Sequence, residues 1–278
     1  MRDGPLVVAG MHRSGTSLVA SWLVAAGVDL GERLLAANAA NPTGYFEDLG
    51  FLDLDRRMLQ KAVTAGEVGH PDWGWTESER LNRESFAAHR DAARALLSAQ
   101  AAHAARSGKA VWGWKDPRST LLLDFWDELG PGARYLLLYR FPWEVVSSIQ
   151  RRGAAVFVGN PGNAWRAWAF YNRHLLDFYR RHPERSLLLS TDTLLDRPEI
   201  LREKLSAKLG LDLPEVPFAT APGLFSRVTG SDPRIALAVA AHPEAAALLA
   251  ELDAAADLSS AGLWSQTPPD GRPPASPG

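Results

Sequence analysis

Residues 10–17 read GMHRSGTS, which has the spacing of a phosphate-binding loop: a glycine, four residues, a second glycine and two hydroxyl residues. Residues 6–9 (LVVA) before the loop predict a short buried strand, and residues 17–26 (SLVASWLVAA) after it predict a helix. A strand, such a loop and a helix in this order surround an anion with backbone N–H groups and the positive end of a helix. The alternative, an ordinary strand-to-helix turn, leaves the arginine and the two hydroxyls beside the glycines unexplained.

Short apolar segments and longer helical segments alternate along the rest of the chain, and this alternation predicts a parallel sheet covered on both faces. The fold class is therefore α/β, a P-loop-type three-layer fold with a central parallel sheet of about four to five strands flanked by helices. Further strands are expected at 110–114, 134–139 and 186–189, and helices at 46–63, 77–106, 142–152, 163–181 and 198–208, with one more ending near 129.

Composition limits the classes of function. The chain has 278 residues, of which 46% are apolar and 22% are charged, so it can bury a sizeable core. A net charge of -2 argues against a dedicated nucleic-acid binder, and the absence of cysteine excludes a disulfide framework or a cysteine-based metal site. No apolar run reaches the roughly 20 residues of a membrane span. The cytoplasm is the expected location, with one α/β domain over 1–266 and a disordered Pro/Gly-rich tail over 267–278.

The loop differs from that of a nucleotide triphosphatase at one position. Thr16 stands where such an enzyme has a lysine, which reaches the β- and γ-phosphates. Its loss favours a donor with a shorter phosphate tail, and such a donor needs no Mg²⁺ bridge.

With HRSGTS at residues 12–17, the chain resembles the PAPS-dependent sulfotransferases, in particular the bacterial and tyrosylprotein types, over roughly residues 6–211 (PAPS is 3′-phosphoadenosine 5′-phosphosulfate). The resemblance implies PAPS as sulfuryl donor, adenosine 3′,5′-bisphosphate (PAP) as product and no metal. It also implies that the loop holds the 5′-phosphosulfate through His12, Arg13, Ser14, Gly15, Thr16 and Ser17.

A second part of the resemblance is an arginine at a strand end with a serine eight residues later. Arg140 and Ser148 match this pair, which in the family holds the 3′-phosphate. Pro142 suits the first position of the helix between them, and Ser148 then lies about 9 Å along that helix. Ser147 is the competing serine, and an exposed arginine with an incidental serine is the alternative.

The third part is Lys115-Asp116-Pro117-Arg118 after the second strand. In the related enzymes a lysine here lies near the bridging oxygen of the donor, and a fixed ammonium there stabilises the charge that develops on the leaving oxygen. Asp116 before Pro117 is the pattern of a helix N-cap, which is favoured over a chemical role. Arg118 contacts phosphate or acceptor, or lies on the first helical turn.

The acceptor must lose a proton to a base within hydrogen-bonding reach. The histidine that cytosolic members use would fall at Pro117 and is absent, whereas residues 44–47 (GYFE) resemble the bacterial segment that carries a glutamate. Glu47 is the predicted base, with Asp48, His12 and His70 as alternatives; a helix-start acid is the structural reading of Glu47. The predicted catalytic residues are Glu47, Lys115 and Arg13.

The acceptor itself is predicted only as a class: a small molecule, natural product or carbohydrate with a hydroxyl or amine. Ten tryptophans are present, and they form either the core or the aromatic walls of an acceptor pocket. Residues 153–162 are long and punctuated by glycine, which suits a lid. Two rival functions stay open: an ATP- and Mg²⁺-dependent kinase using Asp116 or Asp192, and a non-catalytic nucleotide-binding module.

Overall fold

The computed structural model describes residues 4–38, 41, 44–218, 228–230 and 232–264. Its main sheet has four parallel strands in the order β4-β1-β5-β6: β1 (Leu6–Ala9), β4 (Gly113–Lys115), β5 (Arg134–Tyr139) and β6 (Ser186–Ser190). Val7 pairs with Trp114 on one side and with Tyr135 on the other, and Leu137 pairs with Leu188. Since all four strands are parallel, their carboxyl ends meet at one edge of the sheet.

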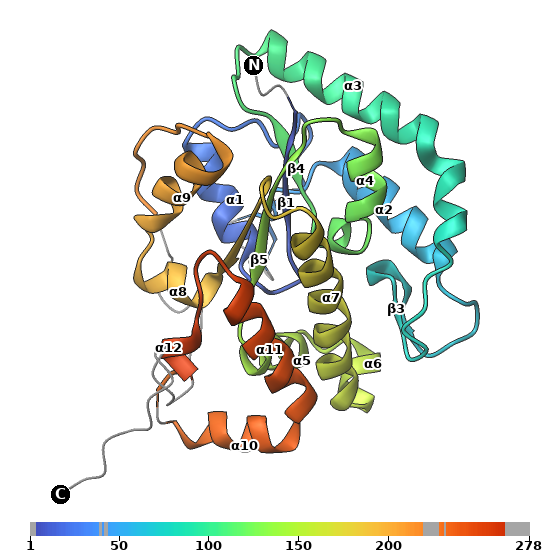
Figure 1. The fold of residues 1–278 in the computed structure, drawn as a ribbon. Helices are drawn as coiled ribbons and strands as arrows, with labels where there is room; N and C mark the ends of the chain where they lie inside the picture. The colour runs from blue at the N-terminus through green and yellow to red at the C-terminus, as the bar shows by residue number, and fades with distance from the viewer. Residues whose placement is uncertain (1–3, 39–40, 42–43, 219–227, 231, 265–278) are drawn as a thin grey trace, which may run out of the picture.

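Each face of the sheet buries its own apolar cluster, as a three-layer fold requires. Leu6, Val8 and Leu136 point to the face covered by α1 (Thr16–Ala25), α8 (Thr191–Asp196) and α9 (Ile200–Leu209). Val7, Tyr135 and Leu137 point to the opposite face, where most of the remaining helices pack. Figure 1 shows the sheet running between these two groups of helices. The predicted fold class is confirmed.

The second face is covered by helices from several parts of the chain. They are α2 (Leu49–Ala62), α3 (Arg90–Arg106), α4 (Leu123–Leu129), α5 (Pro142–Arg152), α6 (Ala155–Gly159), α7 (Gly162–Arg181) and α11 (Pro243–Ala255). Short 3₁₀ helices η1 (Pro71–Trp73), η2 (Arg83–His89) and η3 (Pro117–Leu121) connect them, and β2 (Gly69–His70) pairs with β3 (Trp75–Thr76) as a small hairpin. Two more helices, α10 (Pro233–Ala241) and α12 (Ala261–Trp264), lie towards the C-terminus.

Most predicted boundaries agree with the structure to within three residues, and the expected helix over 77–106 is the main error. Regular helix begins only at Arg90, because the first part is tied to other elements. The Glu77 N–H donates to the Val68 carbonyl, and the Asn82 N–H donates to the Ala62 carbonyl. Glu79 also has a left-handed backbone (φ 53°), which a helix interior does not allow.

Three further expectations need revision. The helix expected from residue 46 begins at Leu49, because Asp48 caps it. The loop expected over 153–162 contains the short helix α6, and no helix was expected beyond 208, where α10 to α12 lie. The proposed disordered tail, 267–278, lies outside the described residues.

Candidate functional site

The glycine loop follows β1 at the carboxyl edge of the sheet. A Cβ on Gly10 would overlap the Leu138 carbonyl, and a Cβ on Gly15 (φ 85°) would overlap the Thr191 methyl group. The loop backbone therefore runs too close to β5 and α8 for a side chain at either position. Arg13 also takes a left-handed conformation (φ 70°), and the Ser14 N–H donates to the Met11 carbonyl at 3.1 Å. The loop is a tight turn held from two sides.

Helix α1 starts directly from this loop at Thr16. The Leu18 and Val19 N–H groups donate to the Gly15 carbonyl, which leaves the first two N–H groups of the helix, those of Thr16 and Ser17, without an acceptor within the helix. Two side-chain atoms of the loop, Ser14 Oγ and His12 Nε2, are buried and have no hydrogen-bond partner among the described residues. Unsatisfied buried polar atoms are costly, and they are unusual in proteins unless a ligand or water completes them. The loop can thus accept an anionic group.

Arg140 and Ser148 lie against the same loop. The Arg13 Nε donates to Ser148 Oγ at 2.8 Å, and one Arg140 nitrogen lies 3.5 Å from the Arg13 carbonyl oxygen. Both Arg140 and Ser148 are buried, whereas Ser147 accepts a hydrogen bond from Arg151 on the exposed side of α5. The structure therefore brings Ser148 rather than Ser147 next to the loop.

Arg140 is held by two carboxylates that were not predicted as its partners. Asp192 Oδ1 lies 3.4 Å from the Arg140 Nε, and Glu144 Oε2 lies 3.6 Å from an Arg140 terminal nitrogen. Asp192 also accepts the Phe141 N–H at 2.8 Å. Burial raises the pKa of Asp192 to about 6, although the charge of Arg140 opposes that shift. These carboxylates fix the guanidinium at the end of β5.

Lys115, the last residue of β4, reaches the start of α1. It is 1% exposed, and its Nζ donates to Glu47 Oε1 at 2.7 Å, to the Tyr45 carbonyl at 3.0 Å and to Ser17 Oγ at 3.1 Å. Because Phe46 has a left-handed backbone (φ 59°), the chain turns between Tyr45 and Glu47, and both groups face the ammonium. A buried lysine–glutamate pair thus lies beside the glycine loop.

Asp48 has a different role from Glu47. Its Oδ1 accepts the Gly50 N–H at 2.8 Å and its Oδ2 accepts the Arg33 N–H at 3.0 Å, so it is the N-cap of α2. Glu47 precedes this cap and lies outside the first turn of the helix. The structural reading of Glu47 as a helix-start acid therefore does not hold, and both oxygens of Asp48 already accept backbone hydrogen bonds.

Asp116 caps η3, as predicted, by accepting the Arg118 N–H at 2.8 Å. The Arg118 guanidinium lies 3.2 Å from Asp116 Oδ1 and 3.9 Å from Glu47 Oε2, and its Nε donates to the Asp72 carbonyl at 2.9 Å. Burial raises the pKa of Asp116 above its ordinary value, although the charge of the nearby Arg118 opposes that shift. Arg118 therefore lies in the buried site beside Glu47 rather than on an exposed first turn.

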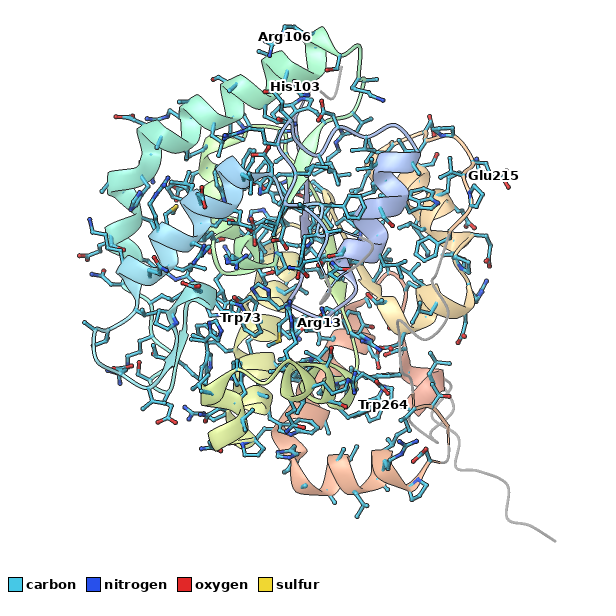
Figure 2. The ribbon with its side chains drawn as sticks, turned by 180° about the vertical axis from the view of Figure 1, so that it is seen from behind. Arg13, Trp73, His103, Arg106, Glu215 and Trp264 are labelled. Carbon is cyan, nitrogen blue, oxygen red and sulfur yellow. The ribbon has the colours of Figure 1, made fainter. Side chains whose placement is uncertain are left out.

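The two alternative histidines both stack on Trp73. The His12 ring lies 4.1 Å from the Trp73 ring, and the His70 ring lies 4.7 Å from it. Burial, with Arg118 and Lys115 nearby, places the pKa of His12 well below its ordinary value. Figure 2 labels Trp73 and Arg13, the loop residue that follows His12. His12 is thus an uncharged ring that stacks on Trp73. The tryptophans that are fully buried in the core are Trp75, Trp114, Trp126 and Trp168.

The fold and these contacts define an α/β protein with a tight glycine loop, a buried arginine and a lysine–glutamate pair at one sheet edge. The sequence model of the sulfotransferase family matches residues 5–215, well over half of the chain. The chain therefore belongs to the sulfotransferase family, whose general chemistry is the transfer of a sulfuryl group.

Three solved structures are similar to this chain. The sulfotransferase domain of the Synechococcus PCC 7002 olefin synthase is 22% identical over 75% of this chain and 73% of that chain, with a TM-score of 0.45. Sulfotransferase STF9 from Mycobacterium avium is 16% identical over 76% of this chain and 64% of its own, with a TM-score of 0.45. Sulfotransferase STF1 from Mycobacterium tuberculosis H37Rv is 16% identical over 75% and 67%, with a TM-score of 0.43. A comparison with curated protein sequences finds no match.

Two searches over the described part of the chain bear on membranes and metals. No single helix there is long and apolar enough to span a bilayer, although α10 and α11, bent by 108°, pass the same test as a pair. No group of three or more metal-ligating side chains is found among those residues. The cytoplasmic location and the metal-free chemistry stay predictions.

Proposed function

We propose that this sulfotransferase uses PAPS as its donor and transfers the sulfuryl group in line to a hydroxyl or amine of a small-molecule or carbohydrate acceptor. The loop from His12 to Ser17 would hold the 5′-phosphosulfate, and Arg140 with Ser148 would hold the 3′-phosphate. The observation that carries the proposal is that Arg13 of the glycine loop contacts both residues: its Nε donates to Ser148 Oγ at 2.8 Å, and its carbonyl oxygen lies 3.5 Å from an Arg140 nitrogen.

The loop residues fit such a donor. The two glycines have no side chain, so the loop backbone packs directly against its neighbours. The buried Ser14 Oγ and His12 Nε2 have no hydrogen-bond partner among the described residues, and a bound polar group would satisfy them. Burial lowers the pKa of Arg13, and the nearby charges of Arg152 and Arg140 lower it further, so an anion beside Arg13 would be favourable. A doubly phosphorylated nucleotide supplies negative charge to both arginines.

Lys115 and Glu47 supply the chemistry of the transfer itself. The donor provides the sulfuryl group; the acceptor oxygen or nitrogen forms the new bond to sulfur, the bridging oxygen leaves with PAP, and the acceptor proton passes to Glu47. Lys115, fixed by three contacts, would stabilise the negative charge on the leaving oxygen. A contact between the Lys115 ammonium and the leaving oxygen would weaken the Lys115–Glu47 ion pair. The Glu47 carboxylate would then accept the acceptor proton more readily.

The two acids that a kinase would require are already bonded elsewhere. Asp116 caps η3 and pairs with Arg118, and Asp192 pairs with Arg140 and the Phe141 N–H. Thr16 in place of the loop lysine and membership of the sulfotransferase family also favour PAPS over ATP.

The decisive test is calorimetry with PAP and with adenosine 5′-phosphate. Arg140→Ala should weaken PAP binding about 10- to 100-fold, since a hydrogen-bonded charged pair contributes about 1.5–3 kcal/mol, and should change adenosine 5′-phosphate binding little. Arg151→Ala, which removes an exposed arginine from the following helix α5, is the matched control. Equal losses for both nucleotides would refute the 3′-phosphate assignment.

A transfer assay separates the rival functions. PAP release from PAPS in the presence of phenols, alcohols, sugars or amines supports the enzyme. Nucleotide binding without release across all four acceptor classes would favour the non-catalytic module, and Mg²⁺-dependent ATP turnover would favour the kinase.

A further inference from the structure

The two carboxylate oxygens of Glu47 face two different cations. Oε1 accepts a hydrogen bond from Lys115 Nζ at 2.7 Å, and Oε2 lies 3.9 Å from a terminal nitrogen of Arg118. Glu47 and both of these cations are buried. Because each cation makes its closest approach to a different oxygen, the two can act separately on Glu47.

Arg118 is fixed by groups other than Glu47. A terminal nitrogen of its guanidinium lies 3.2 Å from Asp116 Oδ1, and the same oxygen accepts the Arg118 backbone N–H at 2.8 Å. The Arg118 Nε donates to the Asp72 carbonyl at 2.9 Å. These contacts do not involve Glu47, so the guanidinium keeps its place when the charge of Glu47 changes.

Lys115 alone cannot hold Glu47 throughout the proposed transfer. Its ammonium stands on a flexible stem, and in that reaction it turns to the leaving oxygen. Oε1 of Glu47 then loses its closest partner, and an unpaired buried carboxylate is costly. A fixed cation at Oε2 lowers that cost and keeps the carboxylate in place while Oε1 becomes free.

Charged and titratable groups from several elements surround Arg118 and Glu47. They are Lys115 of β4, Asp116 at the start of η3, Asp55 of α2, His12 of the glycine loop, His70 of β2 and Tyr171 of α7. Burial lowers the pKa of His12 and of His70, and the charge of Arg118 lowers both further, so neither ring is charged at neutral pH. Burial also raises the pKa of Asp55 well above its usual value, with a further contribution from Asp116. The positive charges in this set of side chains are therefore those of Lys115 and Arg118.

We propose, building on the function above, that Arg118 is the positioning residue of the base. It holds Glu47 through Oε2, while Oε1, released when the Lys115 ammonium contacts the leaving oxygen, takes the acceptor proton. The acceptor oxygen or nitrogen gives up that proton as it bonds to sulfur, and the bridging oxygen leaves with PAP. Arg118 touches neither donor nor acceptor in this role and acts through Glu47.

The first test needs no acceptor. The full chain is labelled with ¹³C at the glutamate carboxyls, and the Glu47 resonance is identified by its loss in Glu47→Gln. In Arg118→Met the midpoint of the Glu47 titration should rise by about one pH unit or more, because the charged carboxylate loses a nearby cation. Arg118→Lys, which keeps the charge, should restore most of the shift. An unmoved midpoint in Arg118→Met would overturn the proposal.

Two further variants guard this test against a loss of folding. Arg118→Met leaves Asp116 buried without its guanidinium partner, so the double variant Asp116→Asn/Arg118→Met replaces it if the single variant unfolds. The midpoint should still rise in the double variant. Arg134→Met removes an equally buried arginine, 7% exposed against 9% for Arg118, at the amino end of β5, and should leave the midpoint where it is.

The second test is PAP release from PAPS, with the phenol, alcohol, sugar or amine that the unaltered chain accepts. Arg118→Met should lower kcat about tenfold or more and move the lower limb of the pH–rate profile upwards, as a misplaced base predicts. The KM for PAPS should stay within about twofold, and Arg118→Lys should recover most of kcat. A lower kcat with an unmoved lower limb would indicate a merely structural role and overturn the proposal. If the unaltered chain releases no PAP, the proposed function fails, whereas the titration midpoint of Glu47 still decides the role of Arg118.

Discussion

The buried pair between Lys115 and Glu47 allows the energetics of the site to be tested apart from its chemistry. At 2.7 Å and an effective dielectric constant of about 20, the Coulomb attraction is about 6 kcal/mol, but much of it offsets the loss of hydration of two buried charges. Removing one partner leaves the other charge buried. We therefore expect Lys115→Met to lower the free energy of unfolding by about 3–5 kcal/mol at pH 7.

The magnitude depends on what remains around Glu47. In Lys115→Met the nearest cation is the Arg118 guanidinium at 3.9 Å, which already pairs with Asp116. Adding Glu47→Gln removes the uncompensated charge, so the double variant should regain about 2 kcal/mol relative to Lys115→Met. The two substitutions are then strongly non-additive.

Urea unfolding at pH 7 gives the free energies of unfolding of Lys115→Met, Glu47→Gln and the double variant, provided that all three free energies depend on urea concentration with the same slope. The exposed pair Arg180–Glu251 is the matched control, because its distance of 2.8 Å is nearly the same and both side chains are about half exposed. A double-mutant cycle on Arg180 and Glu251 should give a coupling energy of about 1 kcal/mol or less. Additive losses at Lys115 and Glu47 would refute the reasoning that burial makes this pair strong.

Turnover then separates stability from catalysis. Glu47→Gln should keep PAP affinity and lower turnover about 100-fold or more, since it retains the shape of the side chain but cannot accept a proton. Near-normal turnover would move the base away from Glu47, whatever the unfolding data show.

Two further predictions concern the loop and its neighbours. Gly15→Ala should cost more stability than Gly153→Ala by about 1–3 kcal/mol in thermal or urea unfolding, because both glycines are left-handed but the new methyl would overlap Thr191 only at Gly15. Thr191→Ser should recover part of that loss, and equal costs at the two glycines would contradict the overlap. For Asp192, a pKa raised from 3.8 to about 6 means that the protonated form is favoured in the folded state, so its stabilising effect is present below about pH 4 and is lost as the pH rises to 6. The stability of Asp192→Asn relative to the unaltered chain should therefore increase by about 2 kcal/mol between these pH values, and a flat difference in parallel urea titrations would contradict the shift.

The fold was predictable because its signals are local. Strand β5 and helix α5 have the bounds that their apolar run and Pro142 indicate, and Asp116 caps η3 as an aspartate before proline suggests. The glycine loop was predictable because its spacing is a local pattern between one strand and one helix, although the close approaches that require Gly10 and Gly15 come from Leu138 of β5 and Thr191 of α8.

The errors fall where a distant partner decides the local structure. The residues before α3 have helical composition, but hydrogen bonds to Val68 and Ala62 hold them out of a helix. Helices α10 and α11 do carry a local signal, a proline at the first position of each and many alanines. In these regions sequence spacing alone does not determine which backbone groups pair.

The pairing of Arg140 shows the same limit within the site, and also the signal that would have overcome it. Asp192 follows β6 by two residues, and Tyr139 of β5 pairs directly with Ser190 of β6. Once β5 and β6 are known to be neighbours, the polar residues after both strands must meet at the carboxyl edge, which brings Asp192 to Arg140. The sequence predicts that a polar residue follows each strand, but the order of the strands in the sheet determines which of these residues form ion pairs. A third strand, β4, brings Lys115 to the loop after β1 by the same rule, so adjacency in the sheet, more than any single motif, assembles the glycine loop, the arginine and the lysine–glutamate pair into one site.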